Sequence, residues 1–475
     1  MRLRFFTAAA IALALIACDG PDQNFAEPAP KPSTNSGSNS GNNPGTDPGT
    51  DPGNDPGNDP EIDPDRFIFD TDLFEKHTDE SSGIVSYLLK SGVGDWECSQ
   101  STYFVNRCMT NDERFIFFFG SNKDFSSDSD RHGMILDLKT RKIYSVPNCH
   151  FGCCPYLDPV EDKLYYGHVY DSKRKATFYR RDLLVDPAKD IKLADLPLSS
   201  IRYTTVSGSP IKRLANHLTL TQDKKKVFLD MRLEDQFVYG LLDLYNGTWE
   251  EWGNEEINLT HGELNPVRDD IALMAIDKHN KLDKTEVKIQ NVTVDGQEVY
   301  PRLQLVTKGT RKVMIPDMTR DKEQYPGGYA SHERWDESGE YVYWCSGGIC
   351  IRNLATDEFK KYAPTWASHC FFSKNREYVA YDDQSLDFYR GCRWRVGFYN
   401  IATNRMVYIH TLLPALVSKT EIQNSTTSNK MASLHPDPHP QFVCNDKYVI
   451  ATAQRPDKTI RLSITPVDQL INATK

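Results

Sequence analysis

The chain has 475 residues, of which 39% are hydrophobic and 11% aromatic, enough for one large domain or two ordinary ones. Its formal net charge of −10 argues against nucleic acid as a partner. An anionic sugar is not excluded, because a local basic cleft can lie in an acidic protein. The frequent aromatic residues suit an all-β protein.

Residues 1–18 have the pattern of a signal peptide. Arginines precede an apolar run from Phe5 to Ala17, which is too short for a stable membrane span. The ending Leu-Ile-Ala-Cys resembles the lipobox of bacterial lipoproteins, which implies lipidation of Cys18; an ordinary signal peptide with a chance cysteine is the alternative. We therefore expect an exported protein, lipid-anchored to a bacterial membrane, either periplasmic or on the cell surface.

Residues 19–65 consist of Ser-Gly-Asn runs and Asp-Pro-Gly repeats, a composition that cannot build a core, so we expect a disordered linker there. It is expected to hold the domain away from the membrane. Binding of structural Ca²⁺ by its aspartates is an alternative role. Residues 66–475 then form the folded domain.

Within this domain, five histidines each stand ten residues before the centre of an apolar run, namely His217, His261, His332, His369 and His439. Segments starting at Asn106 and Cys154 fit the same register with another residue in the histidine slot. Each copy is typical of a short strand, a polar turn and a second strand. Seven copies predict an all-β, seven-bladed β-propeller, with a β-sandwich as the competing fold.

Further strands are expected around this register. Four segments share an apolar run, Asp or Asn, a turn and another strand, and they predict outer strands for blades one, three, five and six: residues 133–146, 239–252, 349–362 and 396–409. An early strand at Phe67–Phe69 is expected to help close the ring. No long amphipathic helix is indicated.

The repeated histidines favour a functional cluster. The same strand position in every blade points at the same end of the channel, so five imidazoles are expected to converge on one opening. The alternative is a structural role, in which the histidine caps the same turn in each blade.

The densest group of polar side chains lies at residues 434–441, where His435 and His439 flank Asp437 between prolines. Mn²⁺ and Zn²⁺ accept such nitrogen and oxygen ligands. His332 and His369 hold the same register in the two preceding blades and are expected to complete a metal site. A rigid proline-rich loop with solvated histidines is the alternative.

A second group combines His150 and His168 in blade two with Arg232 in blade three. The two histidines are expected to approach the same mouth. An arginine at a strand end suits a carboxylate, because its planar fork binds two oxygens at once. A surface role for Arg232 is the alternative, since lysines precede it.

Ten cysteines remain after Cys18, and an exported protein meets an oxidising compartment, so disulfides are expected. The sequence does not fix their connectivity. The plausible pairs are Cys345 with Cys350, Cys98 with Cys108, and Cys370 with Cys392.

The segment Tyr103–Asp112 resembles the opening blade of oligogalacturonate lyases, and HGELNP, HERW and HPDPHP stand where those enzymes carry histidine-led motifs. The resemblance covers residues 97–467. It implies a seven-bladed propeller, a bound Mn²⁺ and β-elimination of a uronate, with His332 and His439 at ligand positions and His261 near the base. The chain departs from the family in carrying Asp437 where a histidine would fall, and a leucine near the family's glutamine.

The order of His150, His168 and Arg232 resembles that of the propeller-type ulvan lyases, which also use a tyrosine acid. Tyr203 and His217 are the candidates for that position and for contact with substrate. Elimination across C4–C5 of a uronate needs a neutralised carboxylate, a base and an acid. On this resemblance Arg232 is the neutraliser and His150 or His168 the base.

We therefore expect a monomeric exported lyase that cleaves a uronate-containing anionic polysaccharide by β-elimination. Ulvan is the favoured substrate on two grounds. One is the order of His150, His168 and Arg232, and the other is that small pectic oligomers are commonly handled inside the cell, where a lipid anchor would have no use. An oligogalacturonate or pectate-type lyase with bound Mn²⁺ is one alternative. A non-catalytic propeller that only binds its partner is another. Membrane contact is expected through the lipid anchor alone.

Overall fold

The computed structural model describes residue 69 and residues 72–123, 130–150, 155–170, 173–201, 211–233, 236–255, 257–281, 292–294, 297–299, 302–313, 330–363, 367–384, 394–414 and 437–475. None of the helices within these ranges is long and apolar enough to cross a membrane. The expected signal peptide, Cys18 and the linker at 19–65 lie outside the described residues.

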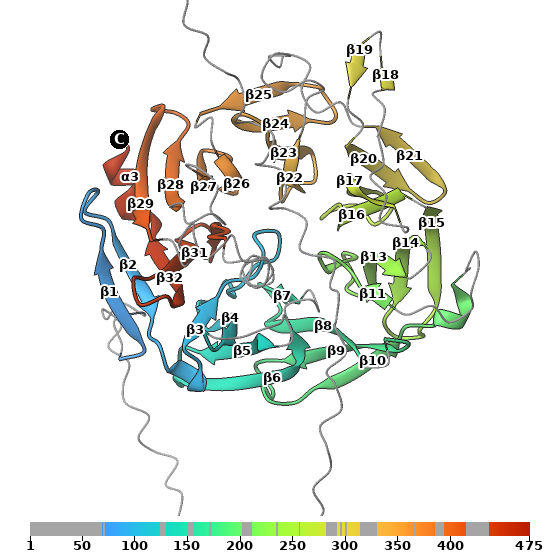
Figure 1. The fold of residues 1–475 in the computed structure, drawn as a ribbon, viewed down its shortest axis with the longest axis horizontal. Helices are drawn as coiled ribbons and strands as arrows, with labels where there is room; N and C mark the ends of the chain where they lie inside the picture. Colours follow the sequence, from blue (N-terminus) through green and yellow to red (C-terminus); the bar gives the residue numbers. More distant parts are fainter. Residues whose placement is uncertain are drawn as a thin grey trace, which may run out of the picture.

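Seven antiparallel sheets stand around a common axis as the blades of a propeller (Figure 1). The prediction of an all-β, seven-bladed ring is therefore confirmed. In blades one to six the strand order follows the chain from the axis outward. Blades one and two consist of β3 (Cys98–Gln100), β4 (Phe115–Ser121), β5 (His132–Asp137) and β6 (Lys142–His150), then β7 (Tyr156–Asp158), β8 (Lys163–Val169), β9 (Ala176–Asp182) and β10 (Ile191–Asp195).

The inner strand of blade three is interrupted, because β11 and β12 both pair with β13. Blade four carries a separate hairpin, β18–β19, outside its sheet. The strands of these blades are β11 (Ile211–Arg213), β12 (Thr219–Leu220), β13 (Lys226–Leu233), β14 (Phe237–Asp243) and β15 (Trp249–Glu255), then β16 (Ile257–Leu264), β17 (Ala272–Lys281), β18 (Val292–Val294), β19 (Gln297–Val299), β20 (Leu303–Thr307) and β21 (Thr310–Val313).

Blades five and six are regular four-stranded sheets. Each of the four segments expected to form outer strands contains two neighbouring outer strands of one blade, so these predictions are confirmed. The pairs are β5–β6, β14–β15, β24–β25 and β28–β29. The strands of blades five and six are β22 (Ser331–Trp335), β23 (Tyr341–Cys345), β24 (Ile349–Asn353) and β25 (Phe359–Tyr362), then β26 (Ala367–Phe372), β27 (Tyr378–Gln384), β28 (Trp394–Asn400) and β29 (Arg405–Leu413).

The seventh blade closes the ring with strands from both ends of the chain. Its order is β1-β2-β32-β31-β30, so the N-terminal strands add to the outer edge of the C-terminal ones. The expected closing strand at residues 67–69 is not where closure occurs: residues 67 and 68 lie outside the described residues, and Phe69 is in a turn. The elements are β1 (Phe74–Thr78), β2 (Val85–Leu89), β30 (Gln441–Val443), β31 (Tyr448–Gln454) and β32 (Ile460–Pro466), with helices η1 (Val93–Asp95), η4 (Leu198–Ser200) and α3 (Val467–Ala473).

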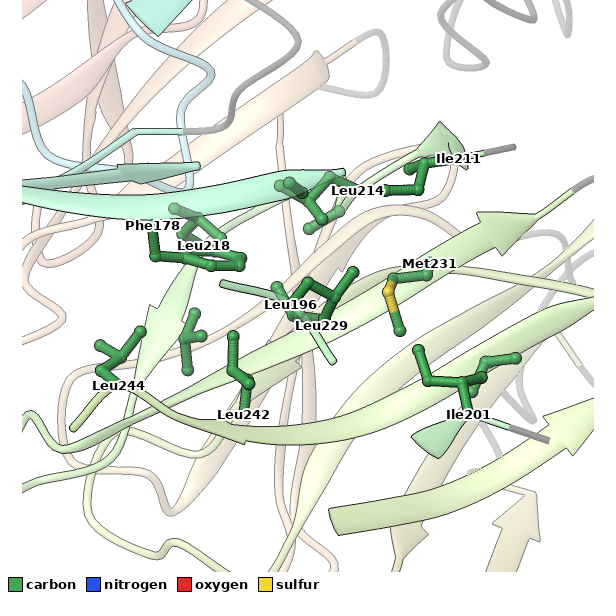
Figure 2. Packing of buried hydrophobic residues seen from close by; sticks show 14 of the residues in the cluster. Phe178, Leu196, Ile201, Ile211, Leu214, Leu218, Leu229, Met231, Leu242 and Leu244 are labelled. Carbon is green, nitrogen blue, oxygen red and sulfur yellow. The ribbon is translucent and has the colours of Figure 1, made fainter. Parts of the chain in front are cut away.

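The hydrophobic core is divided among the interfaces between neighbouring blades. Among the residues that the structure describes there are seven clusters of buried side chains, one between each adjacent pair of blades. Figure 2 shows the cluster between blades two and three, where Phe178 and Leu196 meet Leu229, Met231 and Leu242. Alternate residues of one strand therefore serve two different interfaces, since successive side chains point to opposite faces of a sheet.

The expected disulfides are not found in the described residues. Cys98, Cys108, Cys345 and Cys370 carry free thiols. A clip between Cys345 and Cys350 is excluded by the sheet, because Cys345 packs between blades five and six while Cys350 packs between blades four and five. Side chains on opposite faces of a sheet cannot be bridged. The partner proposed for Cys370, Cys392, lies outside the described residues.

Candidate metal and catalytic site

Each register histidine stands where the innermost strand of its blade is irregular. His217 lies in the gap between β11 and β12, and His439 lies two residues before β30. In β16, β22 and β26 the pairing register shifts around His261, His332 and His369. Such bulges re-aim a side chain and are frequent next to functional sites. The histidine register of the sequence is therefore a repeated bulge at one end of the ring.

The five imidazoles converge around a tyrosine from blade one. Ring centroids lie 5.6 Å apart for His217 and His261, 3.9 Å for His332 and His369, and 4.4 Å for His369 and His439. The ring of Tyr103 stacks on His217 at 4.9 Å and contacts His439 at 4.7 Å.

Tyr103 reaches this position because the chain of blade one leaves its sheet after Gln100. The following segment is fixed from several sides: the Arg334 guanidinium donates to the carbonyl of Phe104 at 2.9 Å, and Asn106 donates to the carbonyl of Pro155. The phenol therefore lies among histidines from blades three, six and seven.

Three of the histidines have Nδ1 occupied by an oxygen acceptor. His261 Nδ1 is 3.0 Å from Glu333 Oε1, and His369 Nδ1 is 2.8 Å from Asp382 Oδ2. His332 Nδ1 bonds the carbonyl of Ser368. These oxygen acceptors favour the tautomer in which Nδ1 carries the hydrogen and donates it. Nε2 then carries the lone pair, which is the usual state of an imidazole that binds a metal or takes a proton.

Within the described residues, one group has the donor atoms for a metal ion. One atom each from His369, Asp437 and His439 lies within 4.8 Å of the other two, and all three residues are buried. His369 Nε2 has no hydrogen-bond partner among the described residues, as expected of a nitrogen kept for a ligand. Two nitrogens and a carboxylate oxygen suit a borderline divalent cation.

The electrostatics of this group reflect its burial. Burial lowers the pKa of His369 to about 3. Burial, with Asp382 nearby, raises the pKa of Asp437 well above its ordinary value. A bound cation would reverse the second effect, because it favours the ionised carboxylate.

A different balance holds around His261. Burial would raise the pKa of Glu333, but Arg302 and the hydrogen bond from His261 outweigh it and hold this pKa at about 2. Arg302 Nη2 lies 3.9 Å from Glu333 Oε2. Burial lowers the pKa of His217 well below its ordinary value, with the neighbouring His261 acting in the same direction.

His150 and His168 come together, but outside the central ring. Their ring centroids lie 6.1 Å apart, and His132 joins them at 5.3 Å from His150. His168 Nδ1 is 3.1 Å from the carbonyl of Asn148. All three histidines are partly exposed, at the interface of blades one and two.

Arg232 lies at another interface. Leu229 and Met231 of β13 pack toward blade two, whereas Phe228 packs toward blade four. Arg232 shares the side of Phe228 and therefore faces blade four, the blade that carries His261. His168, on the side of Tyr166, faces blade one. The expected trio of His150, His168 and Arg232 is thus divided between two interfaces. Tyr203 and His435 lie outside the described residues.

Sequence reasoning did not assign roles to Tyr103, Glu333, Asp382 or Arg302. Glu333 follows a register histidine directly, and Tyr103 stands in the segment that carries the family resemblance, so both were visible as candidates. Asp382 and Arg302 gave no signal, because they meet the histidines only through strand pairing or neighbouring blades.

The solved structures to which the chain is similar include two oligogalacturonate lyases. One, in complex with manganese, is 15% identical with a TM-score of 0.55; the other, from Vibrio parahaemolyticus, is 16% identical with a TM-score of 0.56. Each match covers 83% of this chain and 96% of the other. No protein-family model and no curated protein matches the sequence. At this identity the similarity establishes a shared seven-bladed fold.

Proposed function

We propose that the chain is a lyase that cleaves a uronate-containing anionic glycan by β-elimination. The observation that carries this proposal is the convergence of five imidazoles and Tyr103 on one point, where a group able to bind a cation stands beside a histidine paired with a carboxylate. The shared fold with two oligogalacturonate lyases supports it. Fold alone does not fix function, so the site residues carry the argument.

The residues present match the three demands of the reaction. His261 Nε2 takes the C5 proton, the C4–O4 bond breaks as the C4–C5 double bond forms, and O4 receives a proton from Tyr103. His369, Asp437 and His439 would hold a Mn²⁺ or Zn²⁺ ion, with His332 beside them. The chemistry that such an ion supplies is neutralisation of the uronate carboxylate, which acidifies the C5 proton.

The choice of substrates to test takes account of where Arg232, His150 and His168 lie. The preference for ulvan rested in part on His150, His168 and Arg232 acting on one sugar, and their separation removes that part of the support. Arg232 on the side of His261 is instead suited to a carboxylate at the central site. We therefore propose galacturonate chains as the first substrate to test and ulvan as the second.

The sequence of residues 1–18 supports export and a lipid anchor at Cys18. Such a protein would meet glycans outside the cytoplasm, and the acidic linker at 19–65 would hold the ring away from the membrane surface.

The test is to mix the purified full-length protein with polygalacturonate, its oligomers and ulvan, and to follow the ultraviolet absorbance of the 4,5-unsaturated uronate. We expect a rise with one of them, lost on dialysis against a chelator and restored by Mn²⁺ or Zn²⁺. His261→Ala and His439→Ala should abolish the signal. His77→Asn, on β1 at the outer edge, is the matched control and should keep it. A flat trace on every glycan with either metal would overturn the proposal in favour of a binding protein.

A further inference from the structure

The oxygen that accepts the Nδ1 proton distinguishes the three histidines. His332 donates to a neutral carbonyl, whereas His261 and His369 donate to carboxylates. A carboxylate partner makes an imidazole a stronger base and stabilises the imidazolium that forms when Nε2 takes a proton. Only two of these histidines therefore have a partner suited to proton abstraction.

The two carboxylates differ in their own surroundings. Glu333 has a cation beside it, because Nη2 of the buried Arg302 lies 3.9 Å from Glu333 Oε2. Asp382 accepts backbone N–H groups from His369 and His439, and its side chain also hydrogen-bonds Nδ1 of His369. Asp382 thus connects two of the candidate metal ligands, His369 and His439. Glu333, in contrast, bonds only His261 among the three histidines compared above.

The backbone fixes the same arrangement. His261 has a φ of 54°, and its backbone N–H donates to Asn216 Oδ1 at 3.2 Å. The ring is 5% exposed and Glu333 is 3% exposed, so water does not compete for the contact between them. The contact of Nδ1 with Glu333 fixes the orientation of the imidazole, so Nε2 points away from Glu333.

We propose that Glu333, held by Arg302, is the positioning residue that makes His261 the base of the reaction, while Asp382 holds the metal-binding histidines. This inference rests on the proposed function. In the step concerned, the C5–H bond breaks and a new N–H bond forms at Nε2. The C–H electron pair becomes the C4–C5 π bond, and the C4–O4 pair leaves with O4, which is protonated by the acid. The positive charge on the imidazolium is balanced by Glu333.

The test compares Glu333→Gln with Asp382→Asn at saturating substrate and across a titration of Mn²⁺. An amide can donate to Nδ1 and so place the proton on Nε2, the wrong nitrogen for a base. We expect Glu333→Gln to lose on the order of 10²–10³-fold in kcat with KM and metal affinity unchanged. Asp382→Asn should instead lose about 10–100-fold in metal affinity and recover its kcat when metal is saturating.

A deuterium label at C5 of the substrate separates a positioning role from a loss of folded protein. Slower proton removal makes this step rate-limiting, so the isotope effect on kcat should rise in Glu333→Gln. A smaller active fraction lowers kcat with no change in the isotope effect. An unchanged isotope effect together with lower metal affinity would overturn the inference.

Glu333→Asp keeps the negative charge beside Arg302, so we expect this variant to fold. The side chain is shorter by one methylene, so its oxygen withdraws from Nδ1. We expect a loss of about 10–100-fold in kcat, since displacements on the order of 1 Å have effects of this size. Wild-type kcat in this variant would overturn the inference. Failure of the proposed function is a separate result, because the wild-type protein itself would then be inactive on every uronate glycan.

Discussion

At the scale of single residues, three of the converging histidines have a backbone conformation that side chains with a Cβ rarely adopt. The φ angles are 54° for His261, 56° for His332 and 45° for His439. Such a conformation costs on the order of 1–3 kcal/mol where it is strained, and it persists only when surrounding contacts enforce it. The bonds to Asn216, Ser368 and Asp382 supply that enforcement.

The role of Tyr103 can be tested by removing one atom. Tyr103→Phe keeps the stacking on His217 but deletes the hydroxyl that we assign as proton donor to O4. We expect kcat to fall by about 10²–10⁴-fold on a natural glycan. Activity should be largely retained on a uronate whose C4 substituent is fluoride, which leaves without a proton. Equal losses on both substrates would contradict the assignment.

At the scale of elements, each blade depends on its neighbours for a core. Strand β13 contributes Leu229 to the interface with blade two and Phe228 to the interface with blade four. A loss of packing in one blade can therefore affect the interfaces on both of its sides.

Leu229→Ala tests this dependence. Leu229 is fully buried, and such a substitution destabilises proteins by about 2–5 kcal/mol, since it combines lost transfer energy with a cavity. We expect the midpoint of urea unfolding to fall accordingly. The control is Val185→Ala in an exposed turn, where the side chain is 83% exposed and the effect should stay within about 0.5 kcal/mol. Similar midpoints for the two variants would be inconsistent with the interface described.

The alternation in β13 also shows what the sequence could predict. The apolar side chains at 227, 229 and 231 mark one face of the strand, so the placement of Arg232 on the other face could be predicted from the sequence. The seven-fold register could also be predicted, because the same spacing between one position and the centre of an apolar run recurs along the chain. The pairing of Glu333 with His261 was not, because two bulges in neighbouring blades bring them together across 72 positions.

At the scale of the whole molecule, ring closure includes a buried histidine. His410 of β29 has Nε2 2.8 Å from Ser463 Oγ in β32, and its ring stacks on His77 of β1 at 5.8 Å. It therefore joins blade six to both halves of blade seven. Burial lowers the pKa of His410 from 6.5 to about 3.

This pKa predicts a pH dependence of stability. The unfolded chain binds a proton on His410 below pH 6.5, but the folded protein does so only near 3. The titration of His410 therefore leaves the free energy of unfolding unchanged above pH 6.5. Below that pH it lowers the free energy of unfolding by at most about 1.4 kcal/mol per pH unit. Urea unfolding measured between pH 7 and 5 should show a shallower decrease for His410→Gln than for wild type. An identical slope in the two proteins would contradict this origin.

The seventh blade combines strands from distant parts of the chain, and this affects how the protein folds as it is made. Ser86 and Thr465, 379 positions apart, are joined by a hydrogen bond between their hydroxyls at 2.8 Å. During synthesis, β1 and β2 emerge before the other strands, and their sheet cannot be completed until the last residues of the chain have been made. A nascent chain therefore carries an unpaired strand edge until translation is complete, and edges of this kind promote aggregation.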